Sequence, residues 1–420
     1  MDLATVAVRS VPDWSFHADR ETIVSEPHAR PSMPVSSGDL VLHMGLTCKP
    51  AAQLRLFEIL NLGSEAQHAR HWMKQSDQYR LKFEQHTEFI SITLLFPEAG
   101  SAAVPPDLLN KIADIPDIEA IILTKVQMTP VPIGTAEATP FSTKMFGGTM
   151  RGGMDVRSSL VPDESGFITY SVHSESGAPE EVGRRIQRLI EMETYRTLCL
   201  LGLPLARRAG GSLAESELRL IDVVNSMSTQ SAEDDEKLFE KLSRLLQESG
   251  ALRASTRFRF GASTAYYNLV LQRLTSLEEA KLDDLQTISG FVRSRLDPGI
   301  ATIESVASRQ KTLIDDLSQA LSQLRTRIDL ALNRDNQSLL KSLDARHRQQ
   351  VLIAQTVEGL SAVAITYYAV GLLSYVLKGA APILPAAVPH SVVLAFSVPF
   401  VVSAVWMSLH HLRAKWDKHE

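Results

Sequence analysis

Cysteine is scarce in this chain, whose 420 residues include only Cys48 and Cys199. Two cysteines so far apart make neither a disulfide framework nor a zinc-ligand cluster, so we expect a reducing compartment. Positive charge is not in excess either, because 43 Lys and Arg stand against 48 Asp and Glu. This balance argues against a nucleic-acid-binding surface spread over the whole protein. The N-terminus lacks a basic region followed by a long apolar stretch, so no cleavable secretory signal is expected.

Charge is missing from two stretches near the C-terminus. Residues 360–377 carry no charged side chain, and the stretch extends back to Val351 with Glu358 as its one charge. A membrane-crossing helix needs about 20 apolar residues, and the prolines that follow this stretch interrupt a continuous helix. These features predict a two-helix transmembrane hairpin, made of helix 351–377, external loop 378–390 and helix 391–409. The alternative is a buried helical hairpin in a large core, although such helices usually keep a polar stripe.

The charges that flank the two apolar stretches predict the orientation of the hairpin. Positive residues collect on the cytoplasmic side of a membrane. The loop carries Lys378 alone, whereas the outer ends of the hairpin carry six Lys or Arg residues, at positions 341, 346, 348, 413, 415 and 418. We therefore expect both termini in the cytoplasm, with residues 410–420 as a cytoplasmic tail.

The N-terminal half of the chain has strand-like and helical segments in mixed order. Residues 1–38 look irregular and rich in proline. "LVLHMGLTC", "IEAIILTKVQM" and "GFITYSVHS" are typical strands, and "AAQLRLFEILNLG" is typical of a helix. "YRLKFEQHTEFISITLLF" fits one long strand or a hairpin. The pattern predicts an α/β sheet domain at 39–176, with roughly six strands covered by helices.

From about residue 177 onward the sequence is helical. We expect a helical bundle at 177–296, with a kink or a break near Pro204 and separate helices at 233–249, 255–279 and 283–295. Apolar residues then recur at alternating spacings of three and four, from Ile303 to Leu343, which predicts a long stalk helix at 297–350. Two interpretations stay open, an intramolecular bundle and an oligomeric coiled coil. The predicted class is an α+β membrane protein.

Two short sequences place imidazole beside charged groups at alternate positions. They are "SEPHARP" and "EQHTEF", with the candidate residues Glu26, His28, Arg30, Glu84, His86 and Glu88. In extended chain, alternate residues share one side, so each set could bind a divalent metal or shape an anion site. The alternative, a satisfied polar network on a strand, is the commoner arrangement. No cofactor is expected, because the glycine-rich stretch 147–153 lacks the spacing of a nucleotide-binding loop.

Three polar residues mark the start of the first apolar stretch, Gln355, Thr356 and Glu358. An ionisable residue within a membrane segment is costly, so Glu358 is a candidate pore or membrane-entry residue. The alternative places Glu358 at the level of the lipid headgroups, where its charge is hydrated.

Four segments together resemble a bacterial uncharacterised membrane-anchored protein family, domain-of-unknown-function family 3422. They are "SEPHARP", "FEQHTEFISITLLF", "IEMETYRTLCLLGLPLAR" and "QTVEGLSAVAITYYAVGLLSYVLKG". The resemblance implies a bacterial inner-membrane protein without assigned catalytic residues. The architecture is also similar to CorA-type magnesium channels, but their Gly-Met-Asn motif is missing after the first apolar stretch.

The expected function is that of a non-enzymatic membrane scaffold. It would span the lipid bilayer twice, form a homo-oligomer through the stalk and recruit a cytosolic partner other than nucleic acid. The alternative is a CorA-like divalent-cation channel, with Gln355, Thr356 and Glu358 at its cytoplasmic mouth.

Overall fold

The computed structural model describes residues 14–25, 31–63, 66, 69–97, 106–132, 144–175, 177–229, 234–380 and 390–416. The chain divides into two compact units. The first contains Met1–Thr229 and Lys237–Leu321, and the second contains Gln230–Glu236 and Ser322–Glu420. The expected mixed α+β architecture, with an N-terminal sheet and a long helix, is confirmed.

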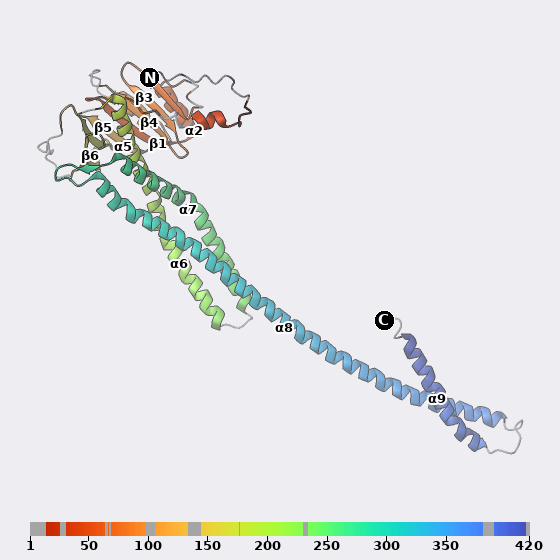
Figure 1. Ribbon diagram of the computed structural model, residues 1–420. Coiled ribbons are helices and arrows are strands. Elements are labelled where there is room, and N and C mark those ends of the chain that lie inside the picture. Colours follow the sequence, from red (N-terminus) through yellow and green to blue (C-terminus); the bar gives the residue numbers. More distant parts are fainter. Residues whose placement is uncertain are drawn as a thin grey trace, which may run out of the picture. The chain divides into compact units, whose positions relative to one another are not determined.

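The first unit is built on a sheet that has nine strands within the described ranges, in the order β2-β3-β4-β1-β5-β8-β7-β6-β9 (Figure 1). Neighbouring strands are antiparallel except for β5 and β8, which pair in parallel. The strands are β1 (Leu40–Cys48), β2 (His71–Gln75), β3 (Arg80–Gln85), β4 (Ile90–Phe96), β5 (Ile118–Met128), β6 (Phe146–Met150), β7 (Met154–Pro162), β8 (Ile168–Ser174) and β9 (Ala280–Lys281).

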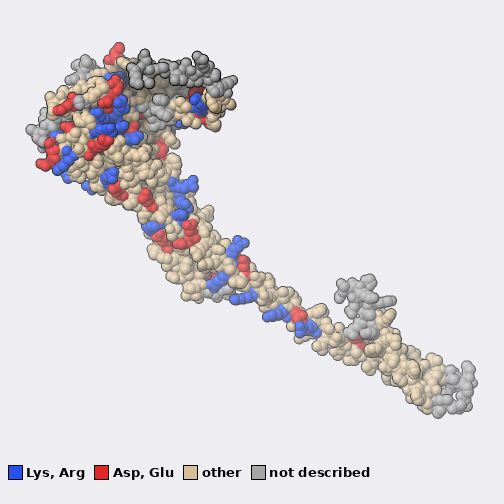
Figure 2. Space-filling model, viewed as in Figure 1, with Lys and Arg blue, Asp and Glu red and all other residues tan. Residues whose placement is uncertain are grey.

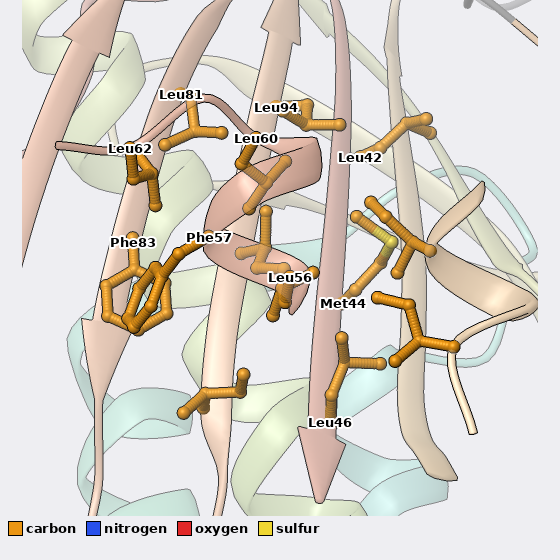
Figure 3. Packing of buried hydrophobic residues seen from close by; sticks show 14 of the residues in the cluster. Leu42, Met44, Leu46, Leu56, Phe57, Leu60, Leu62, Leu81, Phe83 and Leu94 are labelled. Atoms are coloured by element: carbon orange, nitrogen blue, oxygen red, sulfur yellow. The ribbon is translucent and has the colours of Figure 1, made fainter. Parts of the chain in front are cut away.

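One face of the sheet is apolar because side chains alternate along each strand. Leu81 and Phe83 of β3 enter the core beneath the helices α2 (Pro50–Ile59) and α4 (Pro106–Ala113). Leu56 of α2 is fully buried there, next to Phe57, whose ring lies 5.1 Å from that of Phe83 (Figure 3). Lys82 and Glu84 alternate with Leu81 and Phe83 along β3, so their side chains point to the opposite face of the sheet.

The opposite face is covered by α5 (Pro179–Leu200), which begins with proline at its first turn. Two side-chain contacts tie α5 to the strands. The Tyr170 hydroxyl of β8 donates to Glu193 at 2.6 Å, and His43 of β1 bonds Thr194 at 3.2 Å. Glu193 is 1% exposed, and Arg196 also donates to it, so its buried charge is paired.

Three long helices complete the first unit, namely α6 (Gly202–Thr229), α7 (Asp235–Leu277) and the first part of α8 (Ile288–Ala380). Arg309 of α8 donates to Glu217 of α6 at 3.0 Å, and Thr256 of α7 donates to Gln310 of α8 at 3.1 Å. Gln310 and Leu313 of the predicted apolar seam are buried in this unit. This part of the seam thus packs within the chain.

Several expected boundaries differ from the structure. The helices expected at 233–249 and 255–279 form one helix, α7, which passes through Gly250. Residues 283–295 do not form a separate helix. Helix α8 begins later, at Ile288, and continues without a break through Pro298. A helical proline costs about 3 kcal/mol, and the buried Leu296 and Ile300 on either side offset that cost through packing. The break expected near Pro204 is present, between α5 and α6.

The structure resolves two regions of the expected sheet in more detail. The region 71–85 contains the additional strand β2, and β3 and β4 form the hairpin that was one of two alternatives. The glycine-rich stretch 147–153 is the β6–β7 hairpin, in which Gly152 and Gly153 have φ values of +75° and +69°. Glycine adopts such values without strain, so these residues serve a turn.

The second unit contains the C-terminal part of α8 and α9 (His390–Trp416). Within the described residues, one helix, Ile288–Gly379, is long and apolar enough to cross a membrane. None of its most apolar stretch is buried. The apolar part of α9, Val392–Ser408, is shorter. Figure 2 shows uncharged surface over much of these two segments.

Candidate functional site

Polar side chains form a stripe on the sheet face beneath α5. His43 of β1 stands opposite Thr93 of β4, and Glu84 of β3 stands opposite Ser91 of β4. Lys82, His43, Ser91 and Thr93 are all buried. Buried polar groups of this kind are stabilised only when they are hydrogen-bonded or paired. The stripe therefore forms a buried network of hydrogen bonds and ion pairs, whereas the opposite face of the sheet is apolar.

A cavity of about 50 Å³ lies between this stripe and α5. Gln187, Glu191 and Thr194 of α5 line it opposite Lys82 and Glu84. Its volume has room for a few water molecules or one small polar group. The cavity is the candidate functional site of the first unit.

The segment before β1 closes one side of the cavity. Met33 and Val35 line it, and the Val35 N–H donates to the Pro179 carbonyl at 2.9 Å. Gly183 of α5 permits this close approach, because a Cβ atom there would lie 1.9 Å from the Met33 carbonyl oxygen. Glycine at this position therefore keeps the segment seated against α5.

His43 is held as a neutral imidazole. Burial lowers the pKa of His43 to about 4, although the nearby Glu84 carboxylate opposes the shift. The Thr194 hydroxyl donates to the Ile190 carbonyl at 2.8 Å, so it accepts from His43 Nε2–H. His43 Nδ1 then accepts from the Thr93 hydroxyl at 2.9 Å. This assignment of hydrogens satisfies both ring nitrogens and fixes the tautomer.

Glu84 is the centre of the charged part of the network. Its Oε1 atom lies 3.2 Å from Lys82 Nζ and 3.5 Å from His71 Nδ1, and its Oε2 atom lies 3.5 Å from the Ser91 hydroxyl. Burial alone would raise the pKa of Glu84, but the charge and hydrogen bond of Lys82, together with His86 and His43, lower it below its ordinary value. Glu84 is therefore ionised at neutral pH.

The structure separates the residues of the "EQHTEF" sequence. His86 joins the network, with Nε2 at 3.2 Å from the Ser91 hydroxyl and its ring stacked on Phe89 at 4.2 Å. Glu88 does not, because β3 ends at Gln85 and the chain turns. The Glu88 carboxylate instead pairs with Arg259 at 2.9 Å and accepts from the Tyr266 hydroxyl at 2.9 Å, both on α7. The alternation that predicted one shared face stops at the turn.

Glu26, His28 and Arg30 lie outside the described residues. Within the ranges that the structure describes, no group of three or more His, Cys, Asp or Glu side chains is arranged to hold a metal ion. The arrangement around His86 fits the polar-network alternative.

Sequence reasoning missed Lys82, His43 and Thr194. Lys82 could have been found, because it shares a strand face with Glu84 at a spacing of two residues. His43 interrupts an otherwise apolar strand, which is also a visible signal. Thr194 gave none, since its contact with His43 joins residues 151 positions apart.

The second unit holds the three predicted membrane-entry residues on α8. Gln355 and Thr356 are exposed and Glu358 is half-buried. The Thr356 hydroxyl donates to the Leu352 carbonyl at 2.8 Å, which satisfies it within the helix. Further along, α8 and α9 line an apolar groove of about 490 Å³, in which Val363 and Tyr367 lie across from Val402 and Trp406.

Comparison with known proteins identifies one family. The family described as "Protein of unknown function (DUF3422)" matches residues 15–416. No functionally curated protein matches the chain.

Proposed function

The chain belongs to the DUF3422 family of proteins of unknown function, and from this premise we propose that it is a two-pass membrane protein of the bacterial inner membrane that presents its α/β unit to the cytoplasm. The observation that carries the proposal is that no residue in the most apolar stretch of α8 is buried. Leu360 and Val363 are each 71% exposed there, and Phe400 of α9 is 78% exposed.

Exposure of this extent is unfavourable in water. Each fully exposed large apolar side chain forgoes roughly 1.5–3 kcal/mol of burial free energy, and contiguous apolar surface marks a membrane or protein contact. Within a bilayer the same side chains contact lipid. The backbone of both segments is helical, so its polar groups are bonded internally, as hydrocarbon requires.

The hairpin topology extends this proposal to both helices. α8 and α9 lie against each other along the groove that contains Tyr367 and Trp406. The prolines between them and the single Lys378 in the last turn of α8 suit a short external loop, while the positive residues before and after the pair suit the cytoplasmic side. Both termini are then cytoplasmic.

Cysteine accessibility tests this topology directly. In a chain with Cys48→Ala and Cys199→Ala, a cysteine introduced as Ala386→Cys should react with a membrane-impermeant maleimide in intact cells. The matched variant Ser342→Cys should react only after the cells are opened. Reaction of Ser342→Cys from outside, or release of the full-length protein by alkaline carbonate, would refute the two-pass topology.

We favour a scaffold role for the protein over a channel role. The residues after the first apolar stretch, "SYVLKGAAP", lack the Gly-Met-Asn motif of CorA-type channels. The proposed scaffold forms a homo-oligomer through α8, where Leu332, Leu339 and Leu343 are each more than half exposed. The unit then recruits a cytosolic partner.

Cross-linking tests the oligomer, and ion uptake distinguishes the scaffold from the channel. Cysteine cross-linking at Ser342→Cys in membranes should give a discrete oligomer, and Leu339→Asp with Leu343→Asp should abolish it. A strict monomer in membranes would refute the scaffold. Uptake of magnesium or cobalt by vesicles that contain the purified protein, and its loss in Glu358→Ala, would favour the channel instead.

A further inference from the structure

The cavity beneath α5 adjoins a wider hollow on the surface of the same unit. This basin, of about 620 Å³, shares Gln187 and Glu191 with the cavity. Ser32, next to the closing residue Met33, lines the basin as well. We propose that the cavity and the basin together bind a small molecule through an oxyanion group, a carboxylate or a phosphate, that reaches Lys82.

The argument starts from the hydrogen-bond donors of the cavity. The Thr93 and Thr194 hydroxyls donate to His43 and to the Ile190 carbonyl, and the Ser91 hydroxyl donates to Glu84. Gln187 donates to Glu191 at 2.8 Å. The three hydroxyl groups and one amide N–H of Gln187 are therefore in use.

Lys82 is the exception. Its ammonium group has three N–H donors, its side chain is 5% exposed, and its one ion-pair partner in the described part of the chain is Glu84. A buried ammonium with unused donors is costly. A hydrogen-bond acceptor in the cavity would relieve that cost, and an oxyanion forms stronger, charge-assisted bonds than a neutral acceptor.

The basin adds the electrostatic part of the argument. Three arginines line it, Arg184, Arg188 and Arg273, against the two carboxylates of Glu180 and Glu191. Arg273 is paired with Glu191, and Arg184 with Glu181 at 4.0 Å, whereas Arg188 has no ion-pair partner among the described side chains. Within the cavity the charges of Lys82 and Glu84 balance. Arg188 therefore offers a guanidinium group at the mouth that can bind an anion.

The two volumes limit the ligand. The inner cavity of about 50 Å³ accommodates one small polar group, and the basin accommodates the body of a metabolite-sized molecule. Arginine guanidinium groups bind carboxylate and phosphate through paired N–H donors. The site thus selects a small organic anion.

Binding is tested on the full-length protein in detergent micelles, with inorganic phosphate and acetate as separate probes. Thermal unfolding is followed across a concentration series of each probe, with ionic strength held constant by potassium chloride. A ligand that binds the folded state raises the unfolding midpoint in a saturable manner. The proteins compared are the unmodified chain, Arg188→Gln, Lys82→Met with Glu84→Gln, and the control Arg208→Gln, an exposed arginine of α6 outside the site.

The unmodified chain and Arg208→Gln should show the same saturable rise with at least one probe. Arg188→Gln and the double variant should weaken the apparent affinity about tenfold or more, which is the cost of losing a charged hydrogen bond. Removing both charges of the Lys82–Glu84 pair avoids an unpaired buried carboxylate, and Arg188→Gln tests the half-buried mouth if the double variant fails to fold. No saturable rise with either probe, or an equal rise in all four proteins, would overturn the proposal.

Discussion

Replacement of His43 by glutamine removes an imidazole that is enclosed between β1, β4 and α5. The folded protein holds the pKa of His43 at about 4, because burial disfavours the charged form, against a value of 6.5 in solution. The unfolded chain therefore binds a proton at His43 below pH 6.5, whereas the folded chain binds it only near pH 4. The free energy of unfolding therefore decreases as the pH is lowered through this window.

The magnitude follows from the difference in pKa. At about 1.4 kcal/mol per pKa unit, protonation of His43 in the unfolded chain removes about 3 kcal/mol of unfolding free energy between pH 7.5 and pH 4. Glutamine does not titrate, so the variant lacks this loss. At pH 7.5 the variant should be less stable by about 1 kcal/mol, because glutamine cannot bond both Thr93 and Thr194. At pH 4 the order should reverse.

Urea unfolding of full-length protein in detergent measures this reversal. Trp72, which lies half-buried in β2, reports on the sheet when Trp14, Trp406 and Trp416 are replaced by phenylalanine. Titrating groups that do not interact with His43 cancel in the difference between His43→Gln and the parent. The exposed Arg208→Gln of α6 serves as the control for a substitution outside the network. A His43→Gln difference that stays constant from pH 7.5 to pH 4 would refute the buried neutral imidazole.

Three further predictions concern single contacts. Gly183→Ala should lower the unfolding free energy by about 1–3 kcal/mol, since its Cβ meets the Met33 carbonyl; an unchanged urea midpoint would contradict this. Glu279→Ala should cost about 1 kcal/mol, measured in the same way, because its carboxylate accepts the N–H groups of Ile288 and Ser289 at 2.7 Å each and caps α8. Cys199 should resist thiol reagents at pH 8 until urea unfolds the protein, since burial raises its pKa to about 12; rapid labelling of the folded chain would disprove its burial.

Much of the strand pattern was readable from the sequence. The segments "LVLHMGLTC" and "IEAIILTKVQM" coincide with β1 and β5, because β-branched and apolar side chains suit a buried strand. Strand β2 escaped detection, since "HWMKQ" at the edge of the sheet is short and half-exposed. Two-residue β9 pairs with β6 across more than a hundred positions, which no local pattern encodes.

The candidate site was predictable only in part. The alternation of side chains along a strand places Glu84 and Lys82 on one face. The turn after Gln85 separates His86 from Glu88, and an alternating sequence pattern does not reveal where the strand ends. Glu88 finds its partners, Arg259 and Tyr266, on a helix that the sequence places far away.

The sequence by itself determined the local features of this protein: its strands, its long helices, its two uncharged C-terminal stretches and its family. These depend on composition and on periods of two and of three to four residues, which neighbouring positions carry. The tertiary structure alone decided that α5 lies over the polar face of the sheet, so that Thr194 meets His43 and a cavity forms beside Lys82. Such contacts arise from strand register and from the packing of distant elements, and burial then sets the protonation of the groups that they enclose.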